Sequence, residues 1–338
     1  MSESKAMILG CAGTALTPHE IDLYKGERPW GFILFARNLQ APEQIRDLVA
    51  AMRDAVGRPD APVLIDQEGG RVQRIRPPMI EKYPPAQLLS ELYRADRARG
   101  LRAAWLMSRL HAFDLMKLGI TVDCLPVLDV PVEGASNVIG DRAYGFDPVT
   151  VAEMGQAAAE GLKAGGMLPV MKHIPGHGRG MADSHHELPV VNAPLEDLEA
   201  HDFRPFMAMK DELMAMSAHI VFTALDPERP ATTSRKVIEE VIRGRIGFDG
   251  LLISDDSSMN ALKGTLGERA ADIVAGGCDI VLHCNGLMDE MRQVVDKVPL
   301  LAGEALRRAQ AVETGFRTPD DADEAAVRAE FWSLLPTS

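Results

Sequence analysis

Residues 65–74 read IDQEGGRVQR, which places an acid directly after an apolar run and follows it with a glycine pair and two arginines, Arg71 and Arg74. A carboxylate such as Asp66 can accept hydrogen bonds from two hydroxyl groups of a sugar. An arginine can donate to a ring substituent or to an anionic group. The same pattern also fits a turn held by a structural salt bridge, and the residue types alone leave both interpretations open.

Residues 171–186 carry a second set of polar groups along a glycine-rich stretch. His173 and His177 stand four apart, a spacing that suits zinc only on a helix, and the proline and glycine between them argue against a helix. The glycines of this stretch also lack the spacing of a dinucleotide-binding loop. The stretch continues with Asp183 and His185, and a carboxylate two residues from an imidazole can orient it and raise its basicity. We therefore predict a loop that carries a proton-transfer pair.

Residues 253–259 read ISDDSSM and supply two adjacent acids, Asp255 and Asp256, directly after an apolar run. A lone acid after a strand is often a helix cap. Because adjacent side chains point in different directions, we expect one of the two acids to face the axis of the barrel and the other to cap the following helix.

Short apolar runs alternate with helical patterns along the chain, which is typical of a parallel sheet built from strand–helix units. One helix is predicted at 42–56, where apolar residues recur at helical spacing, and another at 194–209; both open with a proline. Eight runs are candidate strands buried on both faces: 7–11, 31–35, 63–65, 121–125, 168–171, 218–222, 251–254 and 279–282.

Polar residues follow these apolar runs repeatedly. They are Asp66, Asp129, Lys172, His173, His219, Asp255 and Asn285. Barrel enzymes build their active sites at the carboxyl ends of several strands, so we predict the α/β class and a single closed (β/α)8 TIM barrel. A doubly wound open sheet shares the alternation and is the structural alternative.

The composition describes an ordinary globular protein, with 46% hydrophobic and 25% charged residues among 338. We expect one domain over residues 1–338, with a peripheral tail from about residue 316. The net charge of −13 argues against a nucleic-acid partner, which would need a concentrated basic surface. No apolar run reaches the roughly 18 residues of a membrane span, and no signal peptide is visible. Four scattered cysteines fit reduced thiols, so the expected compartment is the cytoplasm.

Five strings, taken together and in order, resemble glycoside hydrolase family 3: DQEGGRVQR, PVLDV, IGDRAYG, KHIPGHG followed by DSH, and GFDGLLISDDSSM. They are most similar to the short, single-domain branch of that family, the β-N-acetylglucosaminidases of bacterial peptidoglycan recycling. The strings span about residues 63 to 285, which is nearly the whole predicted barrel.

The resemblance implies roles for the matching positions. Asp255 falls where the family keeps its nucleophile, and Asp183 and His185 fall where this branch keeps an acid/base dyad. The positions that would bind the terminal sugar are Asp66, Arg74, Arg142, Lys172 and His173. Asp129 and His219 are expected to play supporting roles only.

Two positions depart from the expected pattern. The histidines at 185 and 186 are in tandem, and only the register of the DSH string selects His185. Ser257 stands where an apolar residue is expected, and we expect this difference to concern packing rather than chemistry.

The predicted activity is that of an exo-acting retaining glycoside hydrolase, which forms a covalent glycosyl-enzyme and then hydrolyses it. It would remove terminal β-linked N-acetylglucosamine from small peptidoglycan fragments, as a monomer, without cofactor or metal. Three alternatives stay open. One is a β-glucosidase or β-xylosidase of the same family, although such relatives usually carry a further domain; the others are a non-catalytic sugar-binding barrel and a metal-dependent barrel hydrolase.

Overall fold

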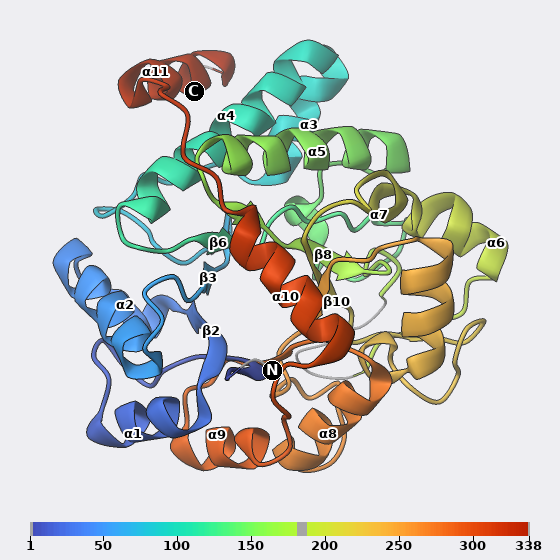
Figure 1. The fold of residues 1–338 in the computed structure, drawn as a ribbon. Helices are drawn as coiled ribbons and strands as arrows, with labels where there is room; N and C mark the ends of the chain where they lie inside the picture. The colour runs from blue at the N-terminus through green and yellow to red at the C-terminus, as the bar shows by residue number, and fades with distance from the viewer. Residues whose placement is uncertain (1–2, 181–187, 337–338) are drawn as a thin grey trace.

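The computed structural model describes residues 3–180 and 188–336, and within them strands alternate with helices as the sequence predicts. The strands form the centre of the molecule and the helices surround them (Figure 1). The barrel strands are β1 (Lys5–Leu9), β2 (Pro29–Leu34), β3 (Val63–Ile65), β6 (Val122–Asp123), β7 (Leu168–Pro169), β8 (Met171–Ile174), β10 (Met214–Ser217), β12 (Leu251–Ile253) and β13 (Val281–His283).

All pairings between these barrel strands are parallel, in the order β13-β1-β2-β3-β6-β7 and then β8-β10-β12. Strands β7 and β8 are separated by a single residue, Val170, and together form the fifth barrel strand, so the nine segments make eight barrel strands and this strand joins the two groups. A parallel bridge between Ile253 and Ile280 links the segments of β12 and β13 and closes the ring. The predicted eight-stranded barrel is therefore confirmed, and an open doubly wound sheet, which would leave two free edges, is wrong.

The sixth barrel strand differs from its prediction. It is β10, at Met214–Ser217, and not the run at 218–222. Only Val221 and Phe222 of that run form a strand, β11, which pairs with β9 (Val190–Val191) outside the barrel. The run at 218–222 holds more of the residues typical of strands, whereas Met214–Ser217 is recognisable only by its complete burial.

The helices are α1 (Pro18–Glu27), α2 (Pro42–Val56), α3 (Ala86–Ala95), α4 (Arg97–Met116), α5 (Pro148–Ala164), α6 (Leu195–Asp197), α7 (Arg204–Ala208), α8 (Leu266–Gly276), α9 (Met288–Val295), α10 (Gly303–Gly315) and α11 (Glu324–Leu334). Helix α2 has its predicted bounds and buries its apolar face. The helix predicted at 194–209 is instead divided into α6, a π-helical stretch at Leu198–Asp202 and α7. Pro205 explains the division, because a proline cannot donate the hydrogen bond that a continuous helix requires.

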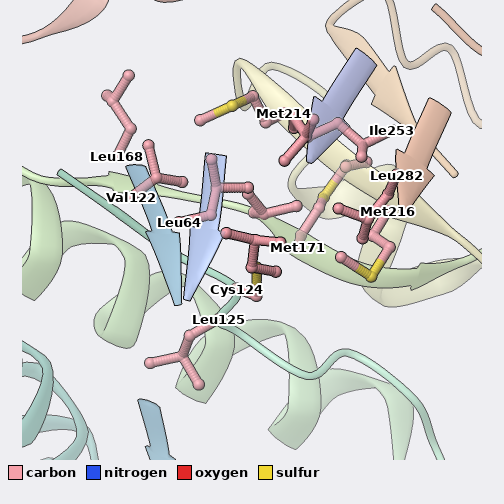
Figure 2. Close-up of a cluster of buried hydrophobic side chains, with 14 of the residues drawn as sticks. Leu64, Val122, Cys124, Leu125, Leu168, Met171, Met214, Met216, Ile253 and Leu282 are labelled. Carbon is pink, nitrogen blue, oxygen red and sulfur yellow. The ribbon is translucent and has the colours of Figure 1, made fainter. Parts of the chain in front are cut away.

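The barrel interior is filled by apolar side chains from many strands (Figure 2). They are all buried and include Leu64, Val122, Cys124, Leu168, Met171, Met214, Met216, Ile253 and Leu282. A filled interior leaves no pore, so any substrate must bind at one of the two ends of the barrel.

Helix α10 covers the amino-terminal end of the barrel, where it crosses the strands in Figure 1. Trp30, near the start of β2, donates from Nε1 to Glu313 Oε1 at 3.0 Å, and Gly315 lies against Leu213, directly before β10. The later helix α11 packs on the outer helix α4, where Arg328 bonds Asp114 at 2.9 Å. The carboxyl end of the strands is therefore the end left for a site.

Candidate active site

A cavity of about 250 Å³ lies at the carboxyl ends of the barrel strands. Six residues that the sequence predicts as site residues line it together: Asp66, Arg74, Arg142, Lys172, His173 and Asp255. A volume below the usual range for drug-sized ligands suits a single sugar ring. The polar residues that follow separate strands in the sequence thus meet in one place.

Asp66 directly follows β3 and lines the cavity. Its Oδ2 accepts from Arg74 Nη2 at 2.9 Å, and its Oδ1 accepts from Lys172 Nζ at 2.9 Å. Burial would raise the pKa of the Asp66 carboxyl, but the charges of Lys172 and Arg74 hold it well below its ordinary value. The salt bridge considered as a structural alternative is therefore present, and it lies in the cavity itself.

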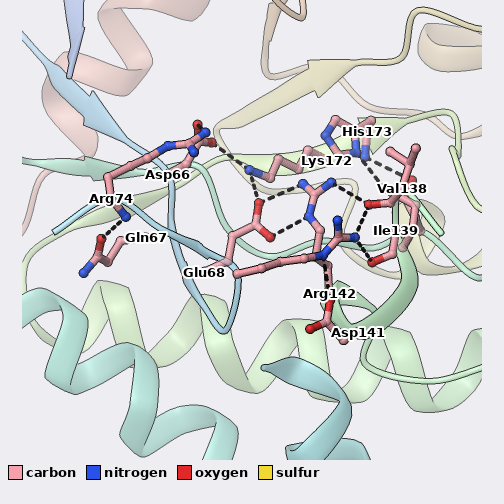
Figure 3. Close-up of polar contacts among 12 residues, drawn as sticks. Asp66, Gln67, Glu68, Arg74, Val138, Ile139, Asp141, Arg142, Lys172 and His173 are labelled. Atoms are coloured by element: carbon pink, nitrogen blue, oxygen red, sulfur yellow. Dashed lines mark hydrogen bonds and ion pairs between the residues drawn. The ribbon is translucent and has the colours of Figure 1, made fainter. Parts of the chain in front are cut away.

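Glu68 also lines the cavity, although we did not predict it as a site residue from the sequence. It lies in the short strand β4 (Gln67–Gly69), which pairs with β5 (Val72–Gln73) in a hairpin after β3. Figure 3 shows its carboxylate between the side chains of Arg142 and Lys172. Its two oxygens accept from Arg142 Nη2 and Nε at 2.8 Å each, and Lys172 Nζ lies 2.6 Å from Oε1. The sequence did contain a signal for this position. Asp66 and Glu68 are two residues apart, and alternate residues of an extended segment share a face, so Glu68 could have been expected beside Asp66.

The charges in this network stabilise one another. Burial would raise the pKa of the Glu68 carboxyl, but Arg142 and Lys172 lower it to about 2. Burial likewise opposes the charge of Lys172, but Asp66 and Glu68 raise its pKa above the ordinary value. Both acids and both cations are thus charged at neutral pH, and they offer fixed acceptors and donors to a polyhydroxylated ligand.

Arg142 reaches the cavity from the long segment between β6 and α5. This segment is attached to the β4–β5 hairpin by Arg71, which bonds Asp141 Oδ1 at 2.8 Å and the carbonyl oxygens of Asn137 and Ile139 at 2.8 and 3.1 Å. The two arginines of residues 65–74 therefore differ in role, because Arg74 bonds a ligand-facing acid while Arg71 fixes a neighbouring segment.

Asp129 organises the histidines on the opposite side of the cavity. It is fully buried, and its Oδ2 lies 2.6 Å from His173 Nδ1, while Oδ1 accepts from the backbone N–H of His177 at 2.6 Å. A carboxylate on Nδ1 leaves Nε2 as the ring nitrogen available to a ligand. The supporting role expected for Asp129 agrees with this geometry. His177 also lines the cavity, although the sequence analysis gave it no role.

The two acids after β12 have different surroundings. Asp256 Oδ1 accepts from the backbone N–H groups of Ser258 and Cys284 at 3.0 and 3.2 Å. Asp255 Oδ1 accepts from the N–H of Asp256 at 2.8 Å, and Asp255 lines the cavity. The two acids therefore differ as expected, since Asp255 lines the cavity and Asp256 stabilises a turn. The helix that follows is capped by Thr265, so the prediction that an acid caps it is wrong.

His219 contacts the backbone of this turn. It is buried, and its Nε2 lies 3.0 Å from the carbonyl oxygen of Asp256, while Nδ1 lies 2.8 Å from Thr232 Oγ1. It does not line the cavity, so its contacts fit the supporting role predicted for it. Ser257 is also fully buried, with Oγ 3.2 Å from His283 Nδ1, so a polar contact occupies the place where an apolar residue was expected.

The predicted acid/base residues Asp183 and His185 lie outside the described residues. The segment that precedes them is bonded to the loop after β6, because the N–H of Ser136 donates to the carbonyl of Gly180 at 2.9 Å. Within residues 3–180 and 188–336, no group of three or more His, Cys, Asp or Glu side chains could hold a metal ion. No helix in the same residues is long and apolar enough to cross a membrane.

A closed barrel that gathers paired acids, basic groups and a strand-end carboxylate around a sugar-sized cavity is the arrangement of a barrel glycosidase. The comparisons with known proteins agree. Residues 27–312 match the glycosyl hydrolase family 3 N terminal domain. A beta-hexosaminidase of Nitrosomonas eutropha is 38% identical over 285 residues, which cover 82% of this chain and 80% of that protein.

A beta-hexosaminidase of Chromobacterium violaceum is 36% identical over 338 residues, which cover 95% of this chain and 93% of that protein. The crystal structure of NagZ from Neisseria gonorrhoeae in complex with N-trifluoroacetyl-D-glucosamine has a TM-score of 0.85 at 31% identity, covering 98% of this chain and 96% of that one. This chain belongs to glycosyl hydrolase family 3. The predicted family and the predicted enzyme class, a glycoside hydrolase of the β-N-acetylhexosaminidase type, are confirmed.

Proposed function

We propose that this glycosidase is exo-acting and retaining, and that it removes a terminal non-reducing β-linked N-acetylglucosamine from peptidoglycan fragments, including those that end in an anhydro-muramoyl residue. One observation carries the proposal. Asp255 and the Asp66–Arg74–Lys172–Glu68–Arg142 network line the same small cavity, which has room for one sugar ring. The similarity to beta-hexosaminidases, and to a NagZ that binds N-trifluoroacetyl-D-glucosamine, favours N-acetylglucosamine as that sugar.

In the proposed mechanism, the charged network holds the hydroxyl groups of the terminal sugar while Asp255 attacks its anomeric carbon. The bond from that carbon to the leaving oxygen breaks as the bond to the Asp255 carboxylate forms. His185, oriented by Asp183, would protonate the leaving oxygen and then take a proton from the water that releases the sugar. The anomeric carbon is attacked twice, first by Asp255 and then by water, and each attack inverts it. The product would therefore keep its β configuration.

The remaining parts of the proposal concern the setting of the enzyme. Muropeptides imported for recycling would be met in the cytoplasm, and we propose that the enzyme works there as a monomer. A β-glucosidase or β-xylosidase would use the same fold, and a non-catalytic barrel would keep the sugar site without Asp255 acting as a nucleophile.

A panel of aryl β-glycosides tests the proposal against both alternatives. Wild type, Asp255→Ala and His185→Ala are assayed on the glucoside, the xyloside and the N-acetylglucosaminide. We expect wild type to cleave the N-acetylglucosaminide well and the others poorly, and Asp255→Ala to lose nearly all activity. Preference for the glucoside or xyloside would contradict the substrate, and undiminished activity of Asp255→Ala would contradict the nucleophile.

A further inference from the structure

Gln67 lies between the two acids of the sugar site and is completely buried. Its Oε1 accepts from the backbone N–H groups of Arg74 and Ile75 at 3.0 and 3.1 Å, and the bond to Arg74 is drawn in Figure 3. Its Nε2 donates to the carbonyl oxygen of Ile75 at 2.9 Å. One side chain therefore joins the two ends of the hairpin, with Asp66 and Glu68 at one end and Arg74 at the other.

An acid on the neighbouring strand holds the backbone of Gln67. Asp123 is the last residue of β6 and lies opposite Ile65 in the parallel pairing of β6 with β3. A backbone bond from Cys124 to the carbonyl of Ile65, at 2.8 Å, ends the regular pairing there. Oδ1 of Asp123 then accepts from the backbone N–H of Gln67 at 3.0 Å. The carboxyl group thus continues the strand pairing past β3, to the residue that separates the two acids.

His111 of helix α4 supports Asp123 from behind the strand. Both side chains are completely buried, and His111 Nδ1 lies 3.5 Å from Asp123 Oδ2, which accepts no hydrogen bond from the residues that the structure describes. Burial raises the pKa of the Asp123 carboxyl, while His111 and the N–H of Gln67 oppose the rise. A buried polar atom is costly without a partner, so Asp123 and His111 stabilise each other when they share a proton.

The same imidazole contacts a second attachment of the hairpin. The ring of His111 meets the ring of Tyr83 edge-on, with 4.8 Å between the ring centres. The backbone N–H of Tyr83 donates to Gln73 Oε1 at 3.0 Å, and its carbonyl oxygen accepts from the N–H of Gly70 at 3.0 Å. His111 therefore packs against both residues that hold the hairpin, Asp123 and Tyr83.

We propose that Asp123 is a positioning residue for the glycosidase reaction: supported by His111, it fixes the peptide N–H of Gln67 and so the places of Asp66 and Glu68. The proposal rests on the proposed function, which takes these two acids as sugar-binding, and it adds a residue that does not line the cavity. An asparagine at 123 could still accept from Gln67 through its oxygen and donate to His111 through its nitrogen, whereas an alanine could do neither.

Kinetics on an aryl N-acetylglucosaminide test this role in Asp123→Ala, Asp123→Asn and Val312→Ala. We expect Asp123→Ala to raise KM about tenfold and to lower kcat less than about threefold, because it frees the hairpin without touching Asp255. Asp123→Asn should stay within about threefold of wild type in both constants. Val312→Ala removes buried apolar atoms from α10, at the other end of the barrel, and controls for a loss of stability alone.

Hydrogen exchange of the hairpin amides, residues 66–75, gives a readout that does not depend on the substrate. Exchange followed by mass spectrometry should be slow in wild type, Asp123→Asn and Val312→Ala, and about tenfold faster or more in Asp123→Ala. Wild type and Asp123→Asn keep the test decisive if Asp123→Ala does not fold. Hairpin exchange in wild type as fast as in exposed loops overturns the inference, and so does a tenfold acceleration in Asp123→Asn.

The inference is also overturned if Asp123→Asn raises KM as much as Asp123→Ala does, or if Val312→Ala raises it equally at the same loss of stability. Asp66→Asn separates a failure of the proposed function from a failure of this inference. If Asp66→Asn leaves KM unchanged, the assignment of the sugar site is wrong. Hydrogen exchange then decides whether Asp123 fixes the hairpin: acceleration in Asp123→Ala alone supports it, and equal exchange in all variants overturns it.

Discussion

The ammonium group of Lys172 lies 2.6 Å from Oε1 of Glu68, and both side chains are almost completely buried. Lys172 comes from the fifth barrel strand and Glu68 from the hairpin that follows the third, so this ion pair links two elements that line the cavity. The same Glu68 carboxylate holds Arg142 through two hydrogen bonds. Glu68 therefore determines where two of the predicted sugar-binding cations lie.

Substituting Glu68 tests this role. We expect Glu68→Gln to destabilise the protein by about 3 kcal/mol, because it leaves two buried cations short of a charged partner. KM for an aryl N-acetylglucosaminide should rise about tenfold, since misplaced cations lose contacts to the sugar. Urea unfolding and steady-state kinetics measure the two effects. Glu133→Gln, which removes an exposed acid from a nearby loop, is the control, and an equal effect of both variants would refute the role of Glu68.

Arg269 should influence catalysis without contacting the sugar. Its Nη1 donates to the carbonyl oxygens of Ser257, Ser258 and Met259 at 3.1 to 3.2 Å, and these residues form the turn that follows Asp255 and Asp256. We expect Arg269→Gln to lower kcat about tenfold while KM changes less than threefold, because a looser turn misplaces Asp255. Arg235→Gln, which removes one partner of the exposed Arg235–Glu239 ion pair, should change neither constant. An increase in KM with unchanged kcat would contradict this account.

The stability of the protein should fall in mildly acidic solution because of His177. Burial lowers the pKa of its imidazole from the ordinary value of 6.5 to about 4, even though the nearby Asp129 opposes the shift. The unfolded chain therefore binds a proton at a higher pH than the folded one does. Stability from this group is complete above pH 6.5 and is lost as the pH falls toward 4, by about 3 kcal/mol in all.

The free energy of unfolding, measured in urea between pH 4.5 and 7, checks this prediction. His177→Gln should flatten the pH dependence in this window. Glu68 acts mainly below it, because folding lowers the pKa of its carboxyl from 4.5 to about 2. The exposed His19 offers the control His19→Gln, which should keep the wild-type slope. A slope that His177→Gln leaves unchanged would contradict the burial argument.

The leaving group should decide how much the dyad matters. We expect His185→Ala to lose about a hundredfold or more in kcat/KM on a substrate with a sugar leaving group, and far less on a dinitrophenyl glycoside. A dinitrophenolate leaves without protonation, so the acid is needed only when the leaving oxygen is basic. His186→Ala is the matched control, because it changes the adjacent histidine. If His186→Ala shows the leaving-group dependence instead, the register that selects His185 is wrong.

Local sequence patterns predict an element well where residues mark both of its ends. Helix α2 and strand β3 have their predicted bounds, because a proline, a glycine and a uniform apolar run mark their ends. Strand β10 was misplaced, since its burial comes from its neighbours in the ring and not from its own residues. The break of the helix at 194–209 could have been predicted, because Pro205 lies inside the apolar pattern and interrupts a continuous helix.

The site shows the same limit. The acids and basic residues at strand ends were recognisable one by one, and the closed barrel brings six of them to one cavity. Their pairing was not recognisable, because Glu68 and Arg142 are 74 residues apart and meet only when the hairpin and the loop after β6 fold over the same opening. His177 was likewise considered only as a metal ligand, and its contact with Asp129 depends on the path of a loop.

The central claim is that Asp255 forms a covalent bond to the sugar, and trapping that bond tests it most directly. The enzyme is incubated with a 5-fluoro-N-acetylglucosaminyl fluoride, whose second fluorine slows release of the sugar, and the digested protein is analysed by tandem mass spectrometry. We predict one added sugar, located on Asp255, in wild type and none in Asp255→Ala. A sugar attached to Asp256 or Glu68, or full turnover of aryl N-acetylglucosaminides by Asp255→Ala, would contradict the account.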